Sequence, residues 1–115
     1  MSADDGSPAD EPITLINVFE VPAQQVGTFV EQWRARAEIM TSAPGFRDAR
    51  LHQALSPNAR FQFVNVAHWD SREAWEAAQA NPEFRARIDA LEAEVRVGAN
   101  PALYRVVGGF DRPHE

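Results

Sequence analysis

The sequence contains no cysteine, which excludes disulfides, thiolate metal sites and a cysteine nucleophile. It is also poor in positive charge: 11 Lys and Arg residues face 17 Asp and Glu residues, for a formal net charge of −6. Nucleic acids and anionic membranes attract clustered basic residues, so we expect neither as a partner. No apolar run approaches the ~20 residues of a membrane span. The first residues lack the basic and apolar regions of a secretory signal, and we therefore expect a cytoplasmic protein.

The chain has the composition of one globular domain. Hydrophobic residues make up 44 % of its 115 residues, enough for an ordinary core without cross-links. Residues 1–12 are small, acidic and interrupted by proline, which is typical of a flexible arm. Residues 111–115 are expected to form a short frayed tail. The folded domain is thus predicted to span residues 13–110.

The hydrophobic pattern of this domain predicts the order β-α-β-β-α-β. Apolar residues at helical spacing predict one helix over residues 23–41. A second helix is expected after a cap at Asp70, with a break at Asn81-Pro82 and an end at Gly98. This order is that of the ferredoxin-like α+β fold, in which helices cover one face of an antiparallel sheet. Runs of β-branched and aromatic residues place the strands at residues 13–21, 46–55, 61–69 and 102–107.

The first strand is apolar on both of its faces. Leu15 and Phe19 lie on one side of it, and Ile16 and Val18 lie on the other. A sheet face that meets water should alternate with polar residues. An apolar face without helices therefore needs another cover, and a second copy of so small a chain can supply it. We expect a homodimer joined sheet to sheet.

Two asparagines interrupt the apolar side of the sheet that we expect to face the helices. Strand alternation places Asn17 with Leu15, and places Asn65 with Trp69. A buried carboxamide left without a partner costs roughly 1–3 kcal/mol. Each amide could bond a backbone group or its twin, or it could contact a ligand. Two of them on one side, with a tryptophan nearby, favour a pocket for a small aromatic molecule.

Several motifs occur in order along the chain: Pro44-Gly45-Phe46, the run FVNVAHWDS at 63–71, Ala74-Trp75 and Pro82-Glu83-Phe84. Together they resemble those of the antibiotic biosynthesis monooxygenase (ABM) family. The likeness covers about residues 13–109 and implies a dimeric α+β barrel built from ferredoxin-like protomers. Within the family, the chain is most similar to the cofactor-free anthrone monooxygenases of polyketide pathways. Those enzymes oxidise polycyclic phenols to quinones with O₂, without metal or flavin.

The resemblance also implies a set of site residues. Asn65, Trp69, Asn17 and His52 match catalytic-pocket positions of the anthrone monooxygenases, with the asparagines holding substrate oxygens and His52 moving a proton. His52 could instead be a surface residue of a half-exposed strand. Trp75 matches a pocket tyrosine, although it could equally be core. The remaining residues expected to bind substrate are Phe63, Leu15 and Phe19 of the strands, with Phe29 and Trp33 of the first helix, which could also be plain core.

Two other functions remain open at this stage. Haem-degrading oxygenases share the fold, but the resemblance places their axial histidine at Ile88 of this chain. We therefore expect no metal and no cofactor, with haem as the alternative. A non-catalytic small-molecule binder, or a cyclase-like protein of a polyketide pathway, would use the same pocket, since a fold does not determine a function. The expected partners are a small aromatic substrate and O₂.

Overall fold

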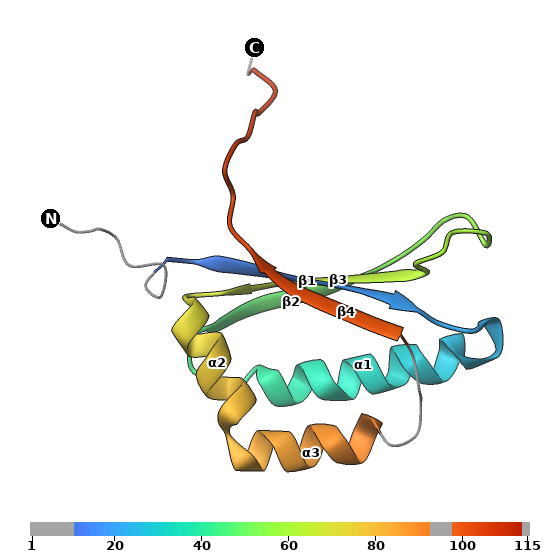
Figure 1. The fold of residues 1–115 in the computed structure, drawn as a ribbon, viewed down its shortest axis with the longest axis horizontal. Helices are drawn as coiled ribbons and strands as arrows, with labels where there is room; N and C mark the ends of the chain where they lie inside the picture. Colours follow the sequence, from blue (N-terminus) through green and yellow to red (C-terminus); the bar gives the residue numbers. More distant parts are fainter. Residues whose placement is uncertain (1–10, 93–97, 114–115) are drawn as a thin grey trace, which may run out of the picture.

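The four apolar segments form one antiparallel sheet, and three helices cover one of its faces (Figure 1). The computed structural model describes residues 11–92 and 98–113. Most of the expected arm and the end of the second predicted helix therefore lie outside the described residues. The elements are β1 (Ile13–Glu20), the short 3₁₀ turn η2 (Ala23–Gln25), α1 (Val26–Met40), β2 (Phe46–Gln53), β3 (Phe63–Trp69), α2 (Arg72–Ala80), α3 (Pro82–Glu92) and β4 (Gly98–Tyr104).

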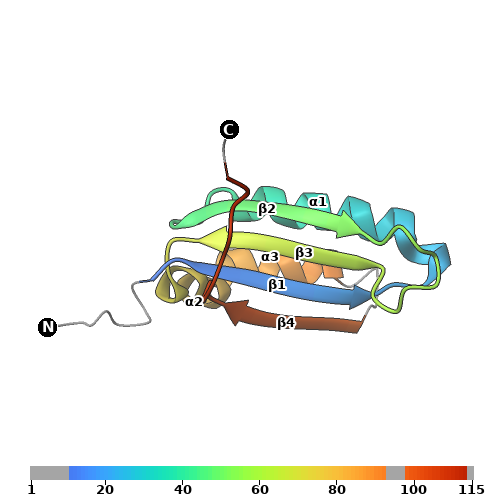
Figure 2. The ribbon, with the colours of Figure 1, turned by 90° about the horizontal axis from the view of Figure 1, so that it is seen from above.

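The sheet has the strand order β2-β3-β1-β4, so the first and third strands lie at its centre (Figure 2). Every neighbouring pair is antiparallel, and Asn17 of β1 lies directly opposite Asn65 of β3. This arrangement confirms the ferredoxin-like α+β fold, and the second predicted helix is indeed divided into α2 and α3. None of the helices within the described ranges is long and apolar enough to cross a bilayer.

The predicted position of the last strand is wrong by several residues. The pattern favoured residues 102–107, whereas β4 spans Gly98–Tyr104. Its register with β1 runs from Glu20 opposite Gly98 to Thr14 opposite Tyr104. The segment that follows Tyr104 continues beyond this register, so its β-branched residues have no strand to pair with. β4 is an edge strand, where the missing N–H of Pro101 is tolerated.

The cap of α2 also differs from the expectation. Ser71, not Asp70, accepts a hydrogen bond from the Ala74 N–H at 3.0 Å. Asp70 instead pairs with Arg47 of β2. The cap of α3 is as predicted, since the Asn81 Oδ1 accepts from two backbone N–H groups of the first turn.

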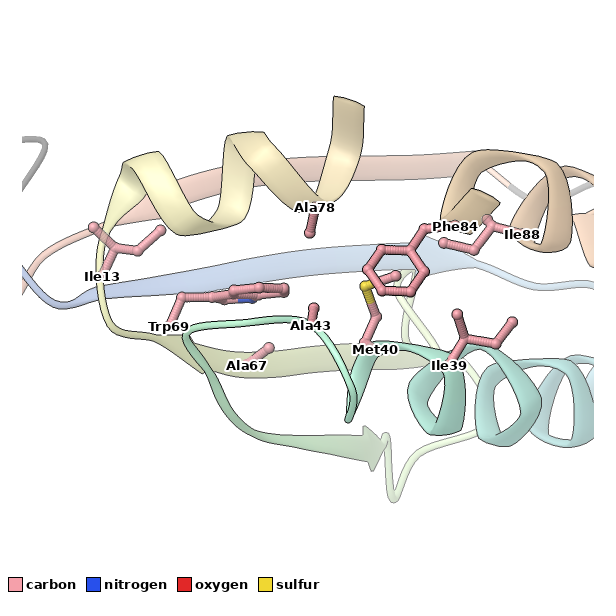
Figure 3. Packing of buried hydrophobic residues seen from close by; sticks show 9 residues of the cluster. All are labelled: Ile13, Ile39, Met40, Ala43, Ala67, Trp69, Ala78, Phe84 and Ile88. Atoms are coloured by element: carbon pink, nitrogen blue, oxygen red, sulfur yellow. The ribbon is translucent and has the colours of Figure 1, made fainter. Parts of the chain in front are cut away.

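The hydrophobic core is divided into two clusters along the sheet. The smaller one gathers Phe19, Val21, Phe29 and Phe63. The larger one contains residues from β1, β3 and all three helices, and Figure 3 shows its side chains meeting between the sheet and the helices. Its buried members are Ile13, Ile39, Met40, Ala43, Ala67, Trp69, Ala78, Phe84 and Ile88.

Candidate functional site

A cavity of about 250 Å³ lies beside the larger cluster, between the helix-facing side of the sheet and the three helices. Its walls are largely apolar or aromatic, with Leu15 from β1 and Ile88 from α3 among them. Small side chains face it where larger ones would fill it, as at Ala49, Ala67 and Ala37. The sheet thus leaves room for a ligand at the level of the paired asparagines.

The two asparagines meet on the sheet side of this cavity. Asn17 and Asn65 both line it and lie directly across from each other on neighbouring strands, so their Cβ atoms are about 4.5–5.5 Å apart. Asn65 is only 6 % exposed and is the buried polar residue among those described. Their convergence agrees with the alternation of the two strands.

The amide of Asn65 is held by a tryptophan of the opposite layer. Trp33 Nε1, on α1, donates to Asn65 Oδ1 at 3.2 Å. An indole N–H is a donor only, so its partner must be the amide oxygen. The other polar atom of the side chain is the amide nitrogen, Nδ2. It makes no hydrogen bond with any described residue.

Asn17 is oriented from the edge of the sheet. Pro101 lies opposite it on β4 and has no N–H to donate. The preceding backbone N–H, that of Asn100, donates instead to Asn17 Oδ1 at 3.0 Å. Because a backbone N–H is also only a donor, Asn17 keeps its Nδ2 group free of partners within the part of the chain that the structure describes.

Two further tryptophans line the cavity, one from the sheet and one from a helix. Trp69 ends β3 and is 2 % exposed, and Trp75 lies on α2. Both line the cavity. The Nε1 atoms of both are buried and have no hydrogen-bond partner among the described residues. Unpaired buried donors are costly in a folded protein.

The structure brings together six of the residues that the sequence suggested for the site. These are Asn17, Asn65, Trp69, Trp75, Leu15 and Trp33. Trp33 combines two roles, because it lines the cavity and also holds Asn65.

Other expected site residues lie elsewhere. Phe19, Phe29 and Phe63 pack against one another in the smaller cluster, with ring centroids 4.8 and 4.9 Å apart, and do not line the cavity. The strand faces of Phe19 and Phe63 were predicted correctly, but the cluster that they form with Phe29 lies farther along the sheet than the cavity extends. His52 follows Leu51, which faces Asn65, so His52 points to the sheet face without helices. It is exposed there, with Nδ1 3.3 Å from the Val64 carbonyl oxygen.

Several cavity residues escaped the sequence analysis. Ala99 and Pro101 were missed because β4 was placed too late in the chain. Arg36, Gln79 and Arg85 look like solvated residues of helix faces, and they reach the cavity only because of how the helices pack. The proline within β4 was a usable signal, since proline in a strand marks an edge.

The described residues do not suit a bound metal or an axially ligated haem. They contain no group of three or more His, Cys, Asp or Glu side chains that could hold a metal ion. Ile88, at the position implied for an axial ligand, is 6 % exposed and lines the cavity. His68 lies on the opposite side of the sheet from Trp69, where its Nδ1 is 2.7 Å from Asp48 Oδ1. No described histidine lines the cavity.

An antiparallel sheet with an aromatic-walled cavity under its helices defines a small-molecule-binding α+β domain. Comparison with known proteins identifies the family within this class. Residues 12–90 match the family described as antibiotic biosynthesis monooxygenase. The chain therefore belongs to this family, as its motifs suggested, and is an enzyme of the monooxygenase type.

Individual relatives show the same fold with different activities. A heme oxygenase (mycobilin-producing) from Mycobacterium tuberculosis is 31 % identical over 96 residues, which cover 84 % of this chain and 90 % of that protein. The structure of a presumed monooxygenase from Shewanella loihica is 35 % identical, with a TM-score of 0.72 over 86 % of this chain and 97 % of the other. SnoaB from Streptomyces nogalater, a cofactor-independent oxygenase, has a TM-score of 0.73 at 22 % identity, covering 89 % of this chain and 99 % of SnoaB, and this likeness shows the fold alone.

Proposed function

We propose that this protein is a cofactor-independent monooxygenase that oxidises a polycyclic phenol or anthrone-type aromatic to a quinone with O₂, in polyketide antibiotic biosynthesis. The observation that carries the proposal is the pair of carboxamides, Asn17 and Asn65, facing each other in an aromatic-walled cavity. The cavity volume of about 250 Å³ lies just below the ~300–1,000 Å³ of typical ligand pockets, which favours one compact aromatic molecule.

The reaction can be written for an anthrone with atoms and electrons in balance. The substrate loses a proton to water and becomes an enolate, whose oxygen accepts hydrogen bonds from the Asn17 and Asn65 amides. The enolate passes one electron to O₂, and the resulting radical and superoxide combine, with a proton, as a hydroperoxide on carbon. Cleavage of the O–O bond with loss of the remaining C–H proton gives the quinone and one water. No histidine is assigned to these steps, since His52 lies on the other face of the sheet.

The aromatic side chains of the cavity bind and cover the substrate. Trp69 ends β3 beside the cavity and stacks on or closes over a planar substrate. A bound aromatic substrate covers the apolar part of the wall and displaces water, which would otherwise compete for the hydrogen bonds of the two amides. The protein thus stabilises the anion and positions it, and the electron-rich substrate itself supplies the reducing power.

Oxygen consumption by metal-free protein with dithranol tests the proposal. We expect quinone formation above the spontaneous rate, and a loss of about 10²–10³-fold in turnover for Asn65→Ala, the magnitude typical of one oxyanion donor. Asn58→Ala is the matched control, because Asn58 lies in an exposed turn between β2 and β3. If Asn65→Ala retains full activity, the proposed site is wrong.

Haem degradation is the second candidate, because a relative of 31 % identity is a heme oxygenase. The cavity has Ile88 where the resemblance implies an axial ligand, so this candidate lacks an iron ligand among the described residues. A hemin titration discriminates the two functions. We expect no Soret band typical of histidine ligation, whereas stoichiometric binding followed by bilin formation would favour haem as the substrate. If neither hemin nor dithranol reacts, a non-catalytic binder becomes the better description.

The proposal includes a homodimer formed through the sheet face that carries no helices (Figure 1). Ile16, Val18, Val64 and Val66 lie on that face, and each is only partly buried in the single chain. Beyond β4 the same chain exposes Val106, Val107 and Phe110, at 82 %, 89 % and 104 % of their full area. Two copies packed face to face would remove these apolar surfaces from water together.

A further inference from the structure

The orientation of the Asn65 amide determines which kind of atom the cavity offers to a ligand. A carboxamide can present either its oxygen, an acceptor, or its nitrogen, a donor, and the two ends are nearly identical in shape. Trp33 removes this ambiguity, because its donor-only indole N–H bonds Oδ1 at 3.2 Å. The nitrogen of Asn65 is then the end that remains for a ligand.

Donors consequently dominate the polar atoms beside the paired asparagines. Asn17 is fixed in the same sense by the Asn100 N–H. The charged side chains of the wall, Arg36 of α1 and Arg85 of α3, are donors as well, and Arg85 is paired with Asp89 at 3.0 Å. The amide of Gln79, on α2, is the neutral side chain of the wall that can also accept. A carbonyl or phenolate oxygen of a ligand can only accept hydrogen bonds, so it suits a wall of donors. A hydroxyl suits it less well, because its hydrogen would face other N–H groups.

We propose that Trp33 is a positioning residue of the site: it holds the Asn65 amide with Nδ2 available, and thereby makes the cavity selective for the deprotonated, oxyanion form of a phenolic ligand. The effect of Trp33 on catalysis rests on the proposed function. The hydrogen bond from Trp33 to Asn65, in contrast, is present without any ligand. Without the indole N–H, the Asn65 amide can turn by half a rotation. Its oxygen would then face the ligand and repel an oxyanion.

Trp33→Phe is the substitution that separates this role from core packing. Phenylalanine keeps an aromatic ring on α1 and removes the donor. Phe29→Leu, on the same helix, is the matched control, because it reduces packing in the smaller cluster without touching the cavity. A packing role predicts that both variants behave alike, whereas a positioning role predicts effects on Asn65 for Trp33→Phe alone.

A first readout needs no ligand. The chain has three tryptophans, so a ¹⁵N-labelled sample gives three indole N–H signals, and the one missing in Trp33→Phe belongs to Trp33. We expect Asn65→Ala to move this signal upfield and to speed its exchange with water, because its hydrogen bond is lost. An unchanged Trp33 signal in Asn65→Ala would overturn the proposal.

A second readout uses 4-nitrophenol, whose absorbance distinguishes phenol from phenolate. We expect wild-type protein to lower the apparent pKa of the bound probe, and Trp33→Phe to raise it again by about one unit, a tenfold loss of preference for the anion. In an Asn65→Ala background, Trp33→Phe should add nothing, since the group it positions is absent. Additive effects, or a wild-type protein that prefers the neutral phenol, would overturn the proposal.

The two proposals fail in different ways. If dithranol is not oxidised but the probe shift is present and depends on Trp33, the monooxygenase reaction is wrong and the positioning role stands. If dithranol oxidation depends on Asn65 but Trp33→Phe changes neither turnover nor the probe shift, the positioning role alone is wrong. We expect Trp33→Phe to lower the kcat for dithranol about tenfold with little change in KM, because the hydrogen bond at stake matters most once the substrate is an anion.

Discussion

His52 shows how a residue can match a family position and still lie outside the site. Its neighbour Leu51 pairs with Asn65 on the helix side of the sheet, and the period of two along a strand sends His52 to the other side. The imidazole contacts the Val64 carbonyl in an exposed position. The catalysis that we propose for the cavity therefore does not involve this side chain.

We predict that His52→Ala keeps dithranol turnover within about twofold of wild type, since surface substitutions away from special features change little. Steady-state oxygen uptake measures this directly. The same measurement on Asn65→Ala gives the fall in turnover expected when a residue of the proposed site is lost. A fall in the His52 variant as large as that of Asn65→Ala would show that the histidine acts on the substrate after all.

Single residues differed in how well the sequence revealed them. Asn17, Asn65 and Trp69 could be placed on one face because strand alternation is a strict geometric rule. The bond between Trp33 and Asn65 could not be predicted, because it joins residues 32 positions apart and depends on how α1 lies across the sheet. Likewise, neither the depth of the cavity nor the separation of Phe29 from it is encoded in a periodic pattern.

At the level of elements, Gly45 lets the turn before β2 pack closely against the start of α2. It has φ +88°, a conformation that favours glycine, and a Cβ added to it would lie 2.5 Å from the Ala74 Cβ. Its carbonyl accepts from the Asp70 N–H at 2.8 Å. The turn before β2 is thus packed directly against the segment that joins Trp69 to α2.

We predict that Gly45→Ala lowers the free energy of unfolding by about 1–3 kcal/mol, because it adds backbone strain to a steric clash. Gly27→Ala is the matched control. Gly27 lies in α1 with open space around its Cα, so alanine there should stabilise the helix by about 0.5–1 kcal/mol. Urea denaturation of both variants measures the difference, and equal stabilities would contradict the tight packing at Gly45.

The sequence predicted an element correctly where a local motif marks its end. It failed where the pairing of two strands determines the position of the element. The asparagine cap of α3 and the break before it follow from Asn81-Pro82, and both are present. The last strand was misplaced because residues 102–107 have the better intrinsic β propensity, while the register with β1 selects Gly98–Tyr104. Tertiary pairing thus overrides a local preference.

On the scale of the whole molecule, the open face of the sheet is the surface through which we propose that two copies assemble. Val66 lies in the middle of β3 on that face, opposite Ile16 of β1 and Arg50 of β2. Its side chain is partly buried in the single chain. If two copies meet there, this position lies within the contact, far from both ends of the sheet.

We predict that Val66→Asp converts a dimer to a monomer, because a carboxylate within the contact loses its hydration, a cost that the cross-strand Arg50 offsets only in part. Sedimentation velocity measures the assembly state. Ala86→Asp, on the exposed side of α3, is the control and should leave the dimer intact. A wild-type chain that sediments as a monomer would remove the basis for sheet-to-sheet pairing.

All three tryptophans of the chain, Trp33, Trp69 and Trp75, line the same cavity. The ultraviolet fluorescence of the protein therefore originates almost entirely from the walls of its own binding site. An aromatic ligand that stacks against these rings would quench the emission, and water admitted to the cavity would shift it to longer wavelengths. The molecule thus carries its own optical reporter of occupancy, and a library of phenols and quinones can be screened against the unlabelled protein before any reaction is known.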